Sequence, residues 1–163
     1  MMSDHYDFRL ACDVRADTPQ QVIATLRYMT RADDYDFNGP PSHPFFASVE
    51  LYDGEAYDTW RHILQCGEGY TPGVFGSSLH EAYRGDQPGG QQIVAPTLDV
   101  HCYVLDDEMG DYFELCKWLA PYSETQGFVG YLRNELTDSL LLLYFRAGAL
   151  VIHEAPSDTN SSG

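Results

Sequence analysis

The chain has 163 residues, a length typical of one globular domain, and 44% of them are hydrophobic. It carries 25 acidic and 9 basic residues, so the formal net charge is -16 at pH 7. This acidity, without any basic cluster, argues against nucleic-acid and anionic-membrane partners, and no apolar run approaches the roughly 20 residues of a membrane-spanning helix.

Two segments each combine a half-buried strand with an amphipathic helix. In the first, apolar residues alternate over 8–15 and then recur with helical spacing over 22–29. In the second, the alternation covers 98–105 and the helical pattern covers 109–119. The two segments align at an offset of 90 residues without a gap. The matching patterns predict an internal duplication.

A second pair of segments supports the duplication. Residues 73–81 resemble residues 127–135 at an offset of 54. Because 90 exceeds 54 by 36, the first copy carries about 36 extra residues, which we place in an insertion at 33–72. We therefore predict an α+β fold, a mainly antiparallel sheet with two long helices on one face. It is built from a duplicated β-α-β-β unit of the ferredoxin-like type, with an insertion in the first copy.

The predicted organisation is a single domain over 1–155. Repeat 1 covers about 6–95 and repeat 2 covers about 97–153. Residues 156–163 hold no apolar anchor, and we expect them to form a disordered tail.

Further elements are expected inside each repeat. In the insertion we expect an edge strand over 45–51 and a short helix over 54–66. In repeat 2, the unbroken apolar run from Leu140 to Phe145 predicts a central strand that is buried on both faces. A hairpin partner is expected over 149–152.

One loop resembles half of a calcium site. Asp34, Asp36 and Asn38 alternate ahead of a glycine, as in the opening of an EF-hand loop. The last ligand of that motif is a glutamate, and Phe45 stands at its position. We interpret the segment as a solvated acidic loop, and we predict no metal and no cofactor.

The cysteines and the N-terminus indicate a compartment. Cys12, Cys102 and Cys116 lie on apolar faces of the expected elements, and buried free thiols are typical of a reducing environment. The N-terminus has neither the charged nor the apolar region of a secretory signal. The sequence therefore predicts a cytoplasmic protein.

No motif of nucleophilic or phosphate chemistry occurs, which favours a protein without enzymatic activity. Glu81 and Glu135 align in the two repeats and could meet as a catalytic carboxylate pair, although Arg133 could pair with Glu135 instead. The residues expected to form a ligand or partner surface are His43, Tyr57, Tyr70, His80, Glu81, Arg133 and Glu135.

Two functions fit these features. The first is an intracellular protein-binding module, of an inhibitor-like or immunity-like kind, whose acidic and aromatic surface binds another protein or a second copy of itself. The alternative is a small-molecule-binding domain or enzyme. Its pocket would lie between the sheet and the 33–72 insertion and would use acidic and histidine side chains.

Overall fold

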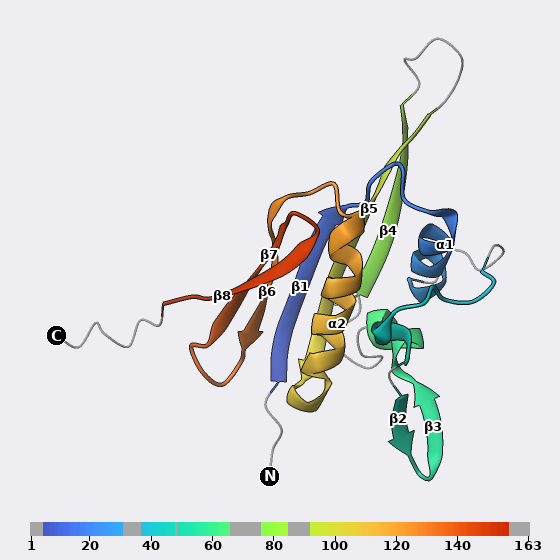
Figure 1. The fold of residues 1–163 in the computed structure, drawn as a ribbon. Coiled ribbons are helices and arrows are strands. Elements are labelled where there is room, and N and C mark those ends of the chain that lie inside the picture. The colour runs from blue at the N-terminus through green and yellow to red at the C-terminus, as the bar shows by residue number, and fades with distance from the viewer. Residues whose placement is uncertain (1–4, 31–36, 48, 66–75, 85–91, 157–163) are drawn as a thin grey trace.

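A six-stranded antiparallel sheet and two α-helices form the body of the protein (Figure 1). The structure is a computed structural model that describes residues 5–30, 37–47, 49–65, 76–84 and 92–156. The strands of the large sheet are β1 (His5–Asp13), β4 (Gly76–Arg84), β5 (Gln92–Leu105), β6 (Gly127–Asn134), β7 (Leu140–Arg146) and β8 (Ala149–Glu154). The helices are α1 (Gln20–Met29) and α2 (Met109–Leu119). A separate two-stranded sheet pairs β2 (Val49–Tyr52) with β3 (Glu55–Asp58).

The strand order of the large sheet is β4-β5-β1-β6-β7-β8, with antiparallel neighbours throughout. Helix α1 follows β1 and precedes β4, which lies on the far side of β5. Helix α2 follows β5 and precedes β6, which lies on the far side of β1. These elements confirm the α+β class and the antiparallel sheet.

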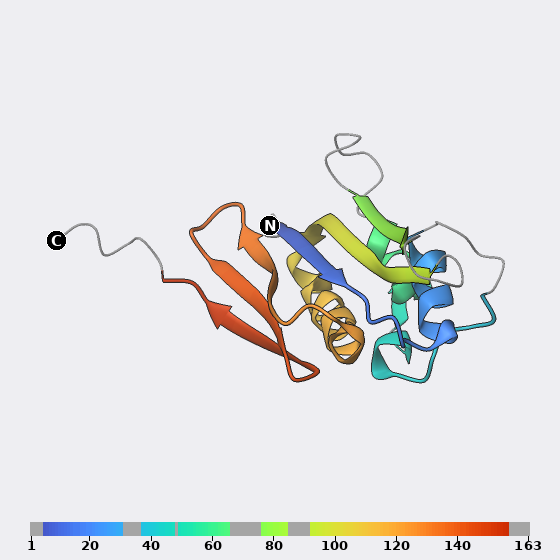
Figure 2. The same ribbon diagram turned by 90° about the horizontal axis from the view of Figure 1, so that it is seen from above.

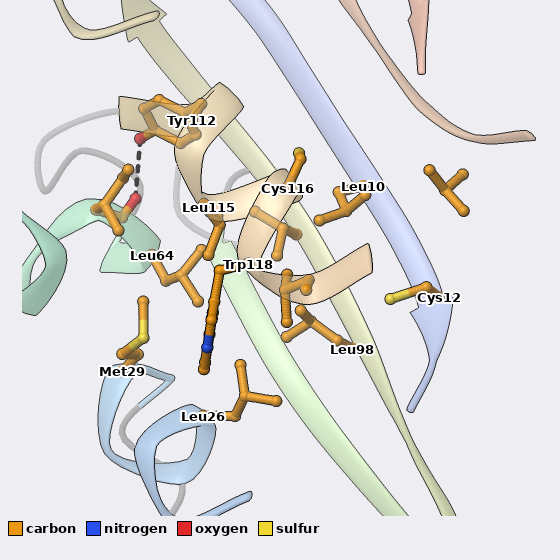
Figure 3. Packing of buried hydrophobic residues seen from close by; sticks show 14 of the residues in the cluster. Leu10, Cys12, Leu26, Met29, Leu64, Leu98, Tyr112, Leu115, Cys116 and Trp118 are labelled. Carbon is orange, nitrogen blue, oxygen red and sulfur yellow. Dashed lines mark hydrogen bonds between the residues drawn. The ribbon is translucent and has the colours of Figure 1, made fainter. Parts of the chain in front are cut away.

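Both helices cover the same face of the sheet (Figure 2). Leu10 and Cys12 of β1 and Leu98 of β5 point toward Leu26 of α1 and Cys116 of α2, and all five are buried (Figure 3). The β1 residues that alternate with Leu10 and Cys12, such as Arg9, are exposed on the opposite face of the sheet. We call this opposite side, which neither α1 nor α2 covers, the open face.

The insertion contributes aromatic rings to the same core. Trp60 and Phe45 are buried, as their apolar character suggests. Phe46 packs edge-on against both Trp60 and Trp118 of α2, with ring centroids 5.4 and 4.8 Å apart. Three short 3₁₀ helices carry this part of the chain, namely Pro44–Ala47, Thr59–Arg61 and Ile63–Gln65.

The helix expected over 54–66 is wrong. Asp53 and Gly54 both have positive φ, 53° and 79°, and form a tight turn between β2 and β3. Asp-Gly is a strong hairpin signal because both central residues of a type I′ turn need positive φ. The edge strand expected over 45–51 is shifted, since Pro44–Ala47 is a 3₁₀ helix and β2 begins at Val49.

The leucine run is less buried than the sequence predicts. β7 is the penultimate strand, and neither α1 nor α2 covers its open face. Leu143 and Phe145 point to the helices and are fully buried, whereas Leu142 is half-buried on the open face. The expected hairpin partner is confirmed as β8.

The cysteines differ from each other in state. Cys12 and Cys116 are buried free thiols, as expected, and burial raises the pKa of both groups, that of Cys12 to about 12. Cys102 is buried but disulfide-bonded, so its interpretation as a free thiol is wrong.

The sheet register corrects the second sequence offset. In the sheet, His80 of β4 pairs with Thr97 of β5, and Arg133 of β6 pairs with Asp7 of β1. Asp7 and Thr97 are counterparts at the sequence offset of 90 residues. His80 and Arg133 therefore correspond, which is an offset of 53 rather than 54. A slip of one residue turns every side chain of a strand to the other face. The duplication itself stays a prediction.

Candidate functional site

The open face carries a connected group of polar and charged side chains at its centre. One oxygen of the Asp7 carboxylate lies 2.6 Å from Nε2 of His101, and the other lies 3.5 Å from Nη2 of Arg133. These residues come from β1, β5 and β6, which are neighbours in the sheet. The Asp7 side chain is only 12% exposed, although it lies on the uncovered face, because its neighbours surround it. The carboxylate therefore contacts side chains from both neighbouring strands.

A second polar contact lies at one end of this group. Tyr103 is opposite Asp7 on β5, and its hydroxyl donates a hydrogen bond of 2.8 Å to Oε2 of Glu135. The ring of His5 stacks on the Tyr103 ring, with centroids 4.7 Å apart. Glu135 follows β6 directly, and its backbone N–H donates to the carbonyl of His5. These contacts connect the start of β1 with the end of β6.

A hollow of about 650 Å³ adjoins this end of the open face. It lies at the turn between β6 and β7. This turn is at the lower left of Figure 1. Arg133 and Leu140 are directly opposite each other on β6 and β7, and both line it. The full lining is Arg133, Asn134, Glu135, Thr137, Asp138, Leu140, Ala155 and Pro156. One cation, two carboxylates and a small apolar surface therefore share one depression.

Two of the site residues predicted from the sequence, Arg133 and Glu135, line this hollow. His80 lies elsewhere on the open face, on β4, where its Nε2 is 3.0 Å from the Ser78 hydroxyl. Glu81 points to the helix side and forms an ion pair with Arg27 of α1, with its Oε1 2.6 Å from Nη2. Glu81 and Glu135 therefore occupy opposite faces and do not form a carboxylate pair. The register offset of 53 explains this separation.

The other selected residues lie far from the hollow or outside the described residues. His43 precedes the first 3₁₀ helix, where its Nδ1 accepts a hydrogen bond from the backbone N–H of Phe45. Tyr57 is exposed on β3 and donates to Glu55. Tyr70, Asp34 and Asp36 lie outside the described residues. Within the described ranges, no three His, Cys, Asp or Glu side chains gather where they could hold a metal ion.

Asp7, His101 and Tyr103 were not selected as site residues from the sequence. Each occupies an outward position in a strand that alternates apolar and polar residues, a signal that places it on the uncovered face. Their mutual contacts depend on the pairing register of β1 with β5 and β6. That register cannot be read from either strand alone.

A second exposed surface is the β2–β3 hairpin, which projects from the body of the protein (Figure 1). Leu51 is 77% exposed and Val49 is 52% exposed, and both share one face with Ala56. Acidic residues accompany this face: Asp58 lies on it opposite Val49 at the base of the hairpin, Asp53 lies in the turn, and Glu55 lies on the other face of β3.

No protein-family model, no curated protein and no solved structure matches this chain. In the described part of the chain, neither helix has the length and apolar character needed to cross a bilayer.

Proposed function

We propose that the protein is a non-enzymatic protein-binding module and that the β2–β3 hairpin docks a basic protein partner. The observation that carries this proposal is the apolar face of the projecting hairpin. Leu51 and Val49 leave large apolar areas in water, and an isolated two-stranded hairpin is only marginally stable by itself. A partner that covered these side chains would bury them and also stabilise the hairpin.

Charge favours a basic partner over a second copy of the chain. The hairpin carries Asp53, Glu55 and Asp58, and among the described residues only Asp58 forms an ion pair, with the Arg61 guanidinium at 3.0 Å. The whole chain has a net charge of -16, so two copies repel each other, whereas a basic protein is attracted and its association is accelerated. An apolar centre with a charged rim is also the usual anatomy of a protein interface.

The test is affinity capture with matched surface variants. Leu51→Asp changes the hairpin, and Leu136→Asp changes another exposed leucine, 64% exposed, after β6. We expect the unaltered protein and Leu136→Asp to retain the same basic protein, and Leu51→Asp to lose it. Raising the salt concentration should weaken this binding, because the charge attraction is screened. Retention that is equal in all three proteins, or a dimer of the chain itself in sedimentation, would contradict the proposal.

A small-molecule-binding role is the second candidate, and the hollow at the β6–β7 turn favours it. This hollow differs in place from the expected pocket between the sheet and the 33–72 insertion. Its lining includes the acidic side chains that were expected, but no histidine.

We also infer that the fold arose by the duplication of a β-α-β-β unit. Leu10 of β1 pairs with Val100 of β5, which is its own counterpart at the offset of 90. A twofold axis between two copies requires such a self-equivalent pair near the middle of the central strands. The single domain over 1–155 remains part of the same proposal, and residues 157–163 of the predicted tail lie outside the described residues.

A cytoplasmic location remains a proposal. The free thiols of Cys12 and Cys116 support it, while the disulfide at Cys102 is an observation against it, because disulfides are typical of oxidising compartments.

A further inference from the structure

Arg133 and Glu135 are oppositely charged, two residues apart and on the same face of the chain. Side chains at this spacing lie about 6.6 Å apart along a strand, close enough for an ion pair. Among the described residues, Arg133 contacts Asp7 and Glu135 contacts Tyr103, and the two side chains form no ion pair with each other. Each charge is held by a different neighbour, and both line the hollow.

The partners of these two charges leave part of each group available. The Arg133 side chain is 59% exposed, and its contact with Asp7 is long at 3.5 Å, so most of its guanidinium donors face solvent. Tyr103 donates to one oxygen of Glu135, which leaves the other oxygen as an acceptor. Asp138 adds a second carboxylate on the turn side of the hollow. The hollow therefore presents hydrogen-bond donors beside acceptors.

The rest of the hollow is apolar. Leu140 lies directly opposite Arg133, and Ala155 and Pro156 follow β8 at its far side. An aliphatic group placed over Leu140 would be shielded from water on this side. The combination is a cationic point, an anionic point and an apolar surface within one depression.

We propose that this hollow binds a free α-amino acid with an apolar side chain. The carboxylate of the ligand bonds to the Arg133 guanidinium, its ammonium group bonds to Glu135, and its side chain lies on Leu140. Bidentate recognition of a carboxylate is the geometry that arginine favours. In an α-amino acid the two charged groups share one carbon, so the ligand fills the space between two side chains that do not reach each other. This proposal concerns a surface separate from the hairpin and does not depend on the protein-binding role.

The test is a titration of the ¹⁵N-labelled protein with three related probes, followed by amide chemical shifts. The probes are L-leucine, N-acetyl-L-leucine, which lacks the ammonium group, and L-leucinamide, which lacks the carboxylate. We expect L-leucine to shift the amides of Thr137, Asp138 and Leu140 in a saturable manner. We expect each of the other probes to bind at least about tenfold more weakly, the usual consequence of losing one charge-assisted hydrogen bond.

Variants connect each charge of the probe to its residue. Glu135→Gln should weaken L-leucine about tenfold and leave N-acetyl-L-leucine unchanged, because that probe has no ammonium group to lose. Arg133→Met should weaken L-leucine and leave L-leucinamide unchanged. Arg9→Met is the matched control, since Arg9 lies on the same open face but does not line the hollow. Leu51→Asp on the hairpin should also leave the binding unchanged.

Three results would overturn the proposal. These are the absence of saturable shifts up to the solubility limit of L-leucine, equal affinity for all three probes, and shifts centred on residues away from the β6–β7 turn. The probe series on the unaltered protein decides the matter by itself if a variant fails to fold.

Discussion

Asp7 of β1 and His101 of β5 are joined by a contact of 2.6 Å on the face of the sheet that neither α1 nor α2 covers. The two residues lie on adjacent central strands and are two residues apart in the register, since Arg9 rather than Asp7 is directly opposite His101. The contact is therefore diagonal. It draws the histidine toward the β6 side of the sheet, where Arg133 also reaches the Asp7 carboxylate.

Replacing Asp7 by Asn should destabilise the protein. The amide keeps the size of the side chain but removes the charge that His101 and Arg133 face, so we expect the free energy of unfolding to fall by about 1–3 kcal/mol. Urea denaturation measures this change. Asp99→Asn is the control, because the Asp99 side chain is 43% exposed and lies 3.9 Å from Arg9. That change should cost about 0–1 kcal/mol, and equal costs for the two variants would contradict the argument.

The two faces of β7 should respond differently to a charge. Leu143→Asp places a carboxylate among fully buried residues and should prevent folding, since burying an unpaired charge costs several kcal/mol against a typical stability of about 5–15 kcal/mol. Leu142→Asp places it on the open face, where Leu142 is half-buried, and the variant should still melt cooperatively. Circular dichroism melts distinguish the two. If Leu142→Asp also fails to fold, the open face is covered in a way that the sheet topology does not explain.

Two glycines should give opposite effects when changed to alanine. A Cβ at Gly130 would overlap the backbone carbonyl oxygen of Arg9 in the neighbouring strand, so Gly130→Ala should lower the stability by about 1–3 kcal/mol or more. Gly110 lies in α2, where a Cβ meets no atom within 4 Å. Gly110→Ala should raise the stability by about 0.5–1 kcal/mol, because alanine loses less backbone freedom in a helix. Chemical denaturation of both variants tests the pair, and a loss at both positions would count against it.

Alkaline pH should weaken the fold through its buried thiols. Burial raises the pKa of Cys12 from its ordinary 9.0 to about 12, so the native state keeps a proton that the unfolded chain loses. The stability contributed by this thiol is complete below pH 9 and is lost as the pH rises from 9 to 12. The slope is at most about 1.4 kcal/mol per pH unit. Cys12→Ala should flatten the dependence of the unfolding free energy on pH in that window. An unchanged slope would show that other groups cause it.

Local patterns predicted the central elements well. Alternation over 8–15 and 98–105 corresponds to β1 and to the second half of β5, and the helical spacing that follows each strand corresponds to α1 and α2. These patterns are reliable because each element buries one face against the same core. The helix predicted over 54–66 is wrong because Ala56, Tyr57 and Trp60 have helical spacing in a segment where the Asp53–Gly54 turn, at positive φ, begins a strand.

The candidate site was only partly predictable. The sequence predicts Arg133 and Glu135 as site residues, and both line the hollow. It also predicts Glu81, from the similarity of residues 73–81 to residues 127–135, but the strand pairing shows that this alignment is shifted by one residue. Sequence similarity between short segments tolerates a shift of one residue, whereas a strand does not, because the shift exchanges its two faces. The contacts of Asp7 with His101 and Arg133 join residues about 100 positions apart and follow from strand pairing alone.

The central place of β1 has a consequence for synthesis on the ribosome. β1 is the first strand of the chain to be made, yet both of its neighbours, β5 and β6, come from the second half. At a typical rate of about 5–20 residues per second, the nascent strand stays without either neighbour for on the order of ten seconds. Its apolar side chains, among them Phe8 and Leu10, are exposed during that interval. Assembly of the sheet is therefore late relative to the synthesis of β1, and the nascent chain is a natural client for chaperones that shield apolar strands.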